Sequence, residues 1–283
     1  MAAVLVAAVL HATWNALVKG VADQVKLFTR LGVVSATITV VSLPWIGLPA
    51  AESWPWVIAS AIIHIGYNVG LLAAYRLGDF GQTYPLARGL GPVIATGIAY
   101  LAIAEPLPPP ALVGVLLVSA AIAVLGLTPW HRVRANRPAV VAALLTGLTI
   151  GSYTVIDGIG VRLSGNAGAY TLVLVGLQGL GTIPLLAWWA RRKAANGPTA
   201  GSAAGVGWGQ AIAVTMLSIG AYGLVLWAQT KGALGAIAAL RESSVVVAAL
   251  IGAVVFRESL SRLRIAASVV ITAGVVLLAT AGG

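Results

Sequence analysis

Ten long apolar stretches follow one another along the chain, and they constrain its fold more than any other feature. Each has 16 to 22 residues, close to the about 20 that an α-helix needs to cross the hydrocarbon core of a bilayer. The stretches are Ala3–Val18, Arg30–Ile46, Val57–Tyr75, Leu86–Ala104, Pro110–Leu127, Ala139–Gly160, Ala169–Trp189, Gln210–Trp227, Ala236–Phe256 and Ile265–Thr280. This pattern predicts an all-α integral membrane protein with ten transmembrane helices and short connections.

Charged side chains are scarce: they make up 8% of the 283 residues, while 59% of the residues are hydrophobic. A soluble domain has about 25% charged residues, so the composition excludes a soluble globular protein and a nucleic-acid-binding protein. Helices are the expected spanning elements, because lipid offers the backbone no hydrogen-bonding partner and a barrel needs alternating polar strands. There is no cysteine, and the three histidines share no helical face. We therefore expect neither a metal site nor a cofactor.

The two halves of the chain resemble each other. A shift of 153 residues superimposes Arg88 on Arg241 and Glu105-Pro106-Leu107 on Glu258-Ser259-Leu260. Apolar helices match by chance, but a common offset for an arginine and an acidic turn favours a true repeat. We therefore expect two five-helix units, residues 1–128 and 138–283. An odd number of helices in each unit gives the two units opposite orientations in the membrane.

The positive charges agree with this inverted arrangement. Of the 17 Lys and Arg residues, 13 lie in the odd-numbered connections, two (Arg162 and Lys231) lie in the even-numbered ones, and two (Arg88 and Arg241) lie within stretches. Cytoplasmic connections are enriched in Lys and Arg. Both termini are therefore predicted on the extracytoplasmic side, and the net charge of +10 describes orientation and not an acidic ligand.

These features resemble the drug/metabolite transporter superfamily, in particular its EamA-type exporters. The resemblance rests on the ten-helix inverted pattern, on the segment Leu10–Lys19 and on the paired acidic turns, and it covers essentially the whole chain. It implies a multi-pass protein of the bacterial inner membrane that exports small metabolites, often amino acids, by alternating access. Within this group, the chain is most similar to the branch that exports aromatic amino acids.

Four charged residues lie within or at the ends of the stretches: Arg88, Asp157, Arg241 and Glu242. A charge at the centre of a spanning helix costs about 2.5–3.5 kcal/mol on insertion scales, so it usually faces the interior of the bundle. Arg88 and Arg241 could bind a carboxylate or gate the path. They could equally form a structural ion pair or extend to the membrane surface, and Glu242 could neutralise Arg241 locally.

Asp157 has two interpretations. It follows Tyr153 by four residues, so both side chains lie on one helical stripe. A buried acid there could accept a proton during a coupled transport cycle. Alternatively, Asp157 pairs with Arg162 at the outer surface.

Polar and aromatic residues recur at a spacing of four in two stretches. His11 and Asn15 flank Trp14 in the first stretch, and His64 and Asn68 flank Tyr67 in the third, with Tyr75 farther along. Such stripes could hold a zwitterionic solute that carries a ring, or they could join helices by hydrogen bonds. Weaker candidates are Ser218, Tyr222 and Gln229 in the eighth stretch and Thr171, Gln178 and Thr182 in the seventh.

The function that these observations favour is a secondary carrier of small organic solutes, most of all amino acids, working as a monomer in contact with lipid. The expected site draws on His11, Trp14, Asn15, His64, Tyr67, Asn68, Tyr75, Arg88, Tyr153, Asp157, Tyr222, Arg241 and Glu242. An intramembrane enzyme is disfavoured, because the acids are scattered and no G-x-S-x-G motif is present. An uncoupled channel or facilitator for small polar solutes is the alternative.

Overall fold

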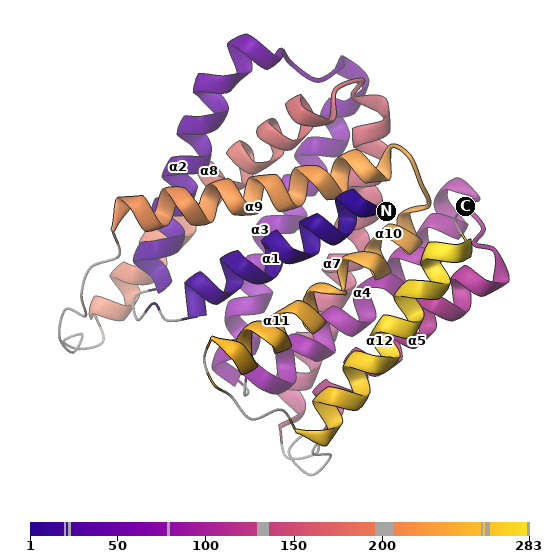
Figure 1. Cartoon of the computed structure of the whole chain (residues 1–283). Coiled ribbons are helices and arrows are strands. Elements are labelled where there is room, and N and C mark those ends of the chain that lie inside the picture. Colours follow the sequence, from indigo (N-terminus) through magenta and orange to yellow (C-terminus); the bar gives the residue numbers. More distant parts are fainter. Residues whose placement is uncertain are drawn as a thin grey trace.

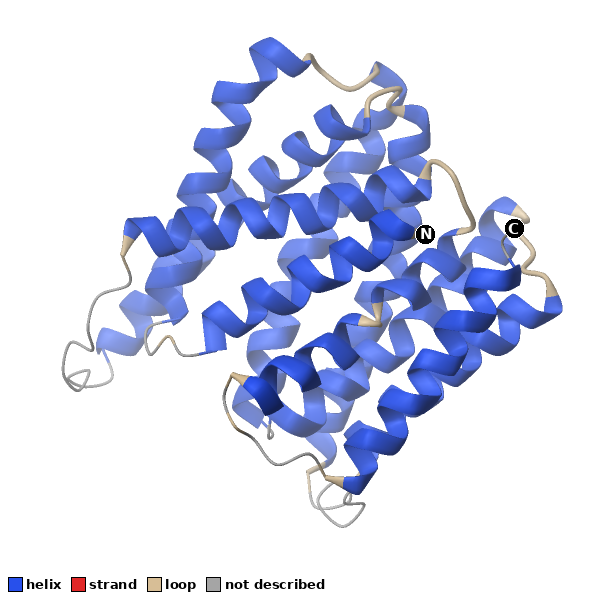
Figure 2. Ribbon diagram, in the orientation of Figure 1, coloured by secondary structure: helices blue, strands red, loops and turns tan. Residues whose placement is uncertain are grey.

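The computed structural model describes residues 1–19, 24–77, 80–128, 136–195, 207–255 and 261–281, with Val21 and Arg257. Side chains are not described at residues 19, 24–25, 69–77, 80–84 and 188–195. Within the described ranges the secondary structure is helical, without strands (Figure 2). The helices are α1 (Ala2–Lys19), α2 (Gln24–Ile46), the 3₁₀ helix η1 (Ala51–Ser53), α3 (Trp54–Leu77), α4 (Phe80–Ile103), α5 (Pro109–Leu127), α7 (Arg137–Leu163), α8 (Ala167–Ala195), α9 (Trp208–Gln229), α10 (Leu234–Arg241), α11 (Ser244–Val254) and α12 (Arg262–Ala281). The predicted all-α class is confirmed.

Eight helical segments of the described chain are long and apolar enough to cross a membrane. The apolar part of α1, Ala2–Val18, is shorter, and the side chains of the last turns of α3 lie outside the described residues. The helices coincide with the predicted apolar stretches and extend beyond most of their ends. The count of ten spans stays a prediction.

The predicted stretch Ala236–Phe256 differs from the structure, because it forms two helices, α10 and α11, in place of one. Around the break the backbone bonds change to the tighter i to i+3 pattern. The amide of Ser243 donates to Leu240 O (3.1 Å), and that of Val245 donates to Glu242 O (2.9 Å). The break places Glu242 at the junction of the two helices, next to Arg241 at the end of α10.

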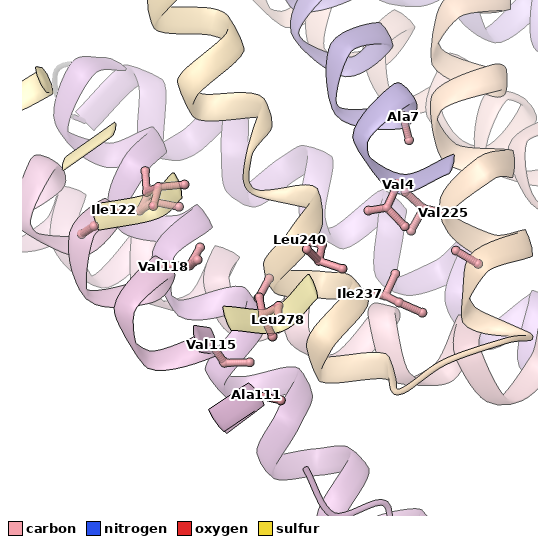
Figure 3. Packing of buried hydrophobic residues seen from close by; sticks show 14 of the residues in the cluster. Val4, Ala7, Ala111, Val115, Val118, Ile122, Val225, Ile237, Leu240 and Leu278 are labelled. Carbon is pink, nitrogen blue, oxygen red and sulfur yellow. The ribbon is translucent and has the colours of Figure 1, made fainter. Parts of the chain in front are cut away.

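Most helix pairs with extensive contacts join the first half of the chain to the second (Figure 1). α2 packs on α8 and α5 packs on α12, while α3 and α4 both pack on α7, and α1 packs on α9 and α11. The largest cluster of buried apolar side chains lies where α1, α5, α9, α10 and α12 meet, and it includes Val4, Val118, Val225 and Leu240 (Figure 3). The two halves therefore form a single bundle.

Glycines allow the closest helix contacts. A Cβ atom on Gly32 would lie 2.9 Å from Gly179 O, and one on Gly179 would lie 2.8 Å from Gly32 O, so α2 and α8 touch backbone to backbone. Gly114 and Gly274 make the same reciprocal contact between α5 and α12, at 2.8 and 2.9 Å. Small residues at such crossings are typical of helix pairs packed in lipid.

Hydrogen bonds between the halves connect several turns at one end of the bundle. Glu105 accepts from Arg162 Nη2 at 2.8 Å and from the amide of Leu234 at 2.7 Å. Ala50 N donates to Ser164 O at 3.0 Å. In Figure 1 both chain ends lie at this end of the bundle.

The interpretation that Asp157 pairs with Arg162 is wrong, because Arg162 binds Glu105 and the carbonyls of Gln229 and Gly232.

Candidate functional site

A cavity of about 190 Å³ lies between α1, α2, α3, α4, α7, α8, α9 and α10. It is central to the bundle, since the elements around it come from both halves of the chain. Most of the predicted site residues line it: His11, Trp14, His64, Tyr67, Asn68, Arg88, Tyr153, Tyr222 and Arg241. Sequence reasoning thus selected residues from six helices that the tertiary structure brings to one place.

The other predicted residues have different positions. Asp157 and Glu242 are fully buried behind the cavity wall, each bonded to a residue that lines it. Asn15 is not part of the wall, because its amide Nδ2 donates to the carbonyl of His11 one turn earlier (2.7 Å). The side chain of Tyr75 lies outside the described residues.

Arg88, Arg241 and Glu242 form what we call the arginine cluster. Arg88 Nε donates to Glu242 Oε2 at 2.8 Å, and Arg241 Nη2 lies 3.6 Å from Glu242 Oε1. The side chains are only 4%, 6% and 0% exposed, so all three charges are removed from water. Two positive charges and one negative charge leave the cluster with one positive charge in excess. Buried charge is costly unless it is paired, so this site favours an anionic group.

Two groups in the cavity wall have unused hydrogen-bond donors. Arg241 Nε and Nη2 are buried and have no hydrogen-bond partner among the described residues, and the same is true of the indole Nε1 of Trp14. A guanidinium group binds a carboxylate with short, charge-assisted hydrogen bonds. Beside them, Arg88 Nη1 lies 3.4 Å from His11 Nε2, which must accept because a guanidinium can only donate.

Asp157 lies at the centre of a second group, the Asp157 cluster, formed with Ser60, His64, Tyr170 and Tyr222. The Tyr170 hydroxyl donates to Oδ1 at 3.0 Å, and the Tyr222 hydroxyl donates to Oδ2. Ser60 lies beside these bonds, one turn before His64 on α3. Both tyrosine donors are neutral, so the cluster contains one uncompensated negative charge when Asp157 is ionised.

His64 joins the Asp157 cluster to the cavity. Its Nε2 atom lies 3.4 Å from the Tyr222 hydroxyl oxygen, and its Nδ1 atom lies 3.0 Å from the backbone carbonyl of Ser60. The imidazole stacks on Tyr153 with ring centroids 3.9 Å apart, and Tyr67 meets Tyr153 edge to face at 5.9 Å. Together these rings form an aromatic wall that fixes the orientation of His64.

Ser60 and Tyr170 were not among the predicted site residues. Ser60 precedes His64 by four residues on α3, so a stripe reaching one turn further back would have included it. Tyr170 belongs to α8, and only the packing of α8 on α7 brings its hydroxyl to Asp157. Of the weaker candidates, Gln178, Thr182 and Ser218 line the cavity.

Comparison with known proteins identifies the family. The sequence matches the EamA-like transporter family over residues 137–280, just over half of the chain. The chain belongs to the EamA-like transporter family. A solved crystal structure of a protein that is 18% identical superposes with a TM-score of 0.76, over 97% of this chain and 94% of that chain. At that identity the likeness concerns the fold alone.

Among curated proteins, none matches the chain significantly in sequence. Family membership, together with the apolar helices, identifies a multi-pass membrane protein that transports small solutes, and the members of this family are transporters and not enzymes. The predicted membership of the drug/metabolite transporter superfamily is thereby confirmed. Which solute is moved has to be argued from the cavity.

Proposed function

We propose that this EamA-like transporter exports neutral amino acids, aromatic ones among them, across the bacterial inner membrane. The observation that carries the proposal is the distribution of buried charge around the cavity. The arginine cluster has one excess positive charge, and the Asp157 cluster has one negative charge when Asp157 is ionised. Tyr153 lies within electrostatic reach of both clusters. A zwitterionic amino acid carries the complementary pair of charges.

The carboxylate of the solute has a natural partner in Arg241. Arg241 lines the cavity, and its Nε and Nη2 atoms have no hydrogen-bond partner among the described residues. The arrangement of these donors in a guanidinium suits two parallel bonds to one carboxylate. The indole N–H of Trp14 offers a further donor. Binding would neutralise the excess positive charge that the bundle otherwise has to accommodate.

The side chain of the solute would contact rings. Trp14, Phe28, Tyr67 and Tyr153 line the same cavity, and aromatic pairs contribute about 0.5–1.5 kcal/mol beyond the area that they bury. The amide of Asn68 and the hydroxyl of Ser218 lie in the wall as well. This lining supports aromatic amino acids as good substrates within the neutral class.

Alternating access fits a bundle of two inverted five-helix units, residues 1–128 and 138–283. The helix contacts support this arrangement, because the packing of α3 and α4 on α7 has its counterpart in the packing of α9 and α11 on α1. A two-fold axis between the inverted units would map the α2–α8 crossing onto itself and the α5–α12 crossing onto itself. Each of these two crossings has a reciprocal glycine pair. A solute site between inverted units can be exposed to each side in turn.

In the membrane we place both termini on the extracytoplasmic side. This orientation follows from the 13 Lys and Arg residues in the odd-numbered connections against two in the even-numbered ones. A monomer surrounded by lipid accounts for the large apolar side chains on the outer faces of the helices, such as Val40, Leu101 and Val254.

Counterflow in proteoliposomes tests the proposal. Vesicles containing purified protein and unlabelled phenylalanine should transiently accumulate labelled phenylalanine. N-acetylphenylalanine, which lacks the ammonium group, and phenylalanine amide, which lacks the carboxylate, should compete at least about tenfold more weakly, since a hydrogen bond to a charged group contributes about 1.5–3 kcal/mol. Equal competition by both analogues would contradict a zwitterion site. Influx without counterflow would identify a channel.

Arg241→Gln provides the matching variant. We expect its apparent affinity for phenylalanine to fall about 10- to 100-fold, with Arg137→Gln at the exposed start of α7 as the control. Wild-type affinity in Arg241→Gln would remove Arg241 from the proposed site.

A further inference from the structure

The hydrogen bonds of the Asp157 cluster can be counted, because most of its groups have a determined role. A backbone carbonyl only accepts, so His64 Nδ1, 3.0 Å from Ser60 O, carries the imidazole proton. Ser60 Oγ lies 3.1 Å from the same nitrogen and can accept from it as well. His64 Nε2 is therefore an acceptor.

The Tyr222 hydroxyl has two acceptors and one proton. Its oxygen binds Asp157 Oδ2 and also lies 3.4 Å from His64 Nε2. When the proton is donated to Asp157, nothing among the described contacts donates to Nε2. The cluster thus holds one proton fewer than its acceptors can take.

We propose that the Asp157 cluster is a proton-binding site and that the ammonium group of the solute competes with that proton. The inference rests on the proposed function and adds the energy source to it. The added proton binds His64 Nε2, which then donates to the Tyr222 oxygen. Equivalently, it binds Asp157 Oδ2 while Tyr222 turns its hydroxyl to Nε2. In both forms all acceptors are satisfied and the negative charge is neutralised.

A solute ammonium group can satisfy the same acceptors. It brings N–H donors for His64 Nε2 and the Tyr222 oxygen, both of which belong to residues of the cavity wall, and its positive charge compensates Asp157. Proton and solute therefore exclude each other at this site. A carrier that can cross the membrane with either one but not with both exchanges solute for protons, which is the coupling an exporter needs.

The titratable and charged groups around the Asp157 cluster leave the binding of the added proton to Asp157 and His64. From α3 come Ser60 and His64, from α8 Tyr170 and from α9 Tyr222, while Tyr153 on α7 stacks on His64. Arg88 on α4 and Arg241 on α10 lie within electrostatic reach of Tyr153, and Arg241 is also within reach of His64. The other buried acid next to the cavity, Glu242, is bound to Arg88. Asp157 is thus the buried acid of the cavity that has only neutral donors.

Proton release on solute binding tests the inference directly. Phenylalanine is added to purified protein in weakly buffered detergent solution at a pH where the cluster is protonated, and released protons are followed with an indicator dye. We expect about one proton released per solute bound, and an apparent affinity that falls about tenfold for each pH unit below the range in which the site titrates. In proteoliposomes, a proton gradient should then drive accumulation of labelled phenylalanine.

Asp157→Asn should bind phenylalanine more weakly, release no protons and lose the pH dependence. Glu52→Gln, at an exposed acid of η1, should behave as wild type. Should Asp157→Asn fold poorly, His64→Gln serves instead and should reduce proton release. Binding of phenylalanine without proton release in the wild type would overturn the inference and leave the proposed function intact. Absence of phenylalanine binding would overturn the proposed function itself.

Discussion

Glu242 and Asp157 are both fully buried carboxylates beside the same cavity, and they have opposite kinds of partners. Glu242 lies between two guanidinium groups, with its closest bond to Arg88 at 2.8 Å. Asp157 is bound by the hydroxyl groups of Tyr170 and Tyr222, which are neutral. The same functional group therefore occurs once in an ion-pair cluster and once in a neutral network.

The difference separates a structural charge from an exchangeable one. Protonation of Glu242 would leave two buried guanidinium groups without compensation, which is strongly unfavourable. Protonation of Asp157 breaks no ion pair, because its partners are hydroxyls that can also accept hydrogen bonds. Burial alone does not show which acid can change its protonation state, and the partners decide it.

The largest expected effect tests the ion-pair side of this comparison. Glu242→Gln should lower the free energy of unfolding by about 3–5 kcal/mol, because it removes the negative charge that compensates the buried guanidinium groups of Arg88 and Arg241. Thermal unfolding of purified protein in detergent measures this. The double variant Arg88→Leu/Glu242→Leu should lose less than the single variant. Wild-type stability of Glu242→Gln would show that the arginines are compensated in another way.

Asp157→Asn should have a smaller effect, about 1–3 kcal/mol, since its amide oxygen still accepts from a hydroxyl while its amino group must find a new acceptor. The same unfolding assay, run beside Glu242→Gln, ranks the two acids. If Asp157→Asn were the more destabilising variant, the contrast between a structural and an exchangeable acid would be lost.

Tyr170→Phe removes one of the hydroxyl donors to Asp157 and leaves the cavity wall untouched. We expect a loss of about 0.5–1.5 kcal/mol, the usual contribution of one hydrogen bond. A Tyr100→Phe variant, which changes an exposed tyrosine, is the matched control. A loss of unfolding free energy as large as that of Asp157→Asn would mean that the Tyr170 hydroxyl provides most of the stabilisation in the Asp157 cluster.

The smallest effect is expected for an acid outside the two clusters. Glu105 is 19% exposed and its partner Arg162 is 32% exposed, so solvent screens their attraction. Glu105→Gln should cost about 0.2–1 kcal/mol, because the amide oxygen can still accept from the amide of Leu234. A loss comparable to that of Glu242→Gln would show that the turns at this end stabilise the bundle more than the buried clusters do.

Much of the fold could be predicted from local sequence. A helix in lipid must satisfy its own backbone and cover its length with apolar side chains, so each stretch identified its helix within a few residues. The exception, the break between α10 and α11, lies in an apolar stretch without proline. Glu242 bonded to Arg88 on α4 occupies that junction, and the polar run at residues 241–244 does not by itself reveal this partner.

The candidate site was likewise predictable in part from local sequence. His64, Arg88 and Asp157 could be selected because polar residues within spanning segments are costly and therefore face the interior. Of the two interpretations of Asp157, the pairing with the nearby Arg162 is wrong, because its hydrogen-bond donors come from α8 and α9. Asn15 follows His11 by four residues, as Asn68 follows His64. Asn68 lines the cavity, whereas Asn15 donates to the carbonyl of His11.

The sequence by itself determined the class of protein, the position of its helices and the short set of polar residues that could act, because each of these depends on residues within a single helix. Only the tertiary structure decided which of them meet. The bond from Arg88 to Glu242 joins residues 154 positions apart, and that from Tyr222 to Asp157 joins residues 65 positions apart. Such pairs depend on how helices pack and rotate against one another, which is decided by the packing of the whole bundle and not by any one segment.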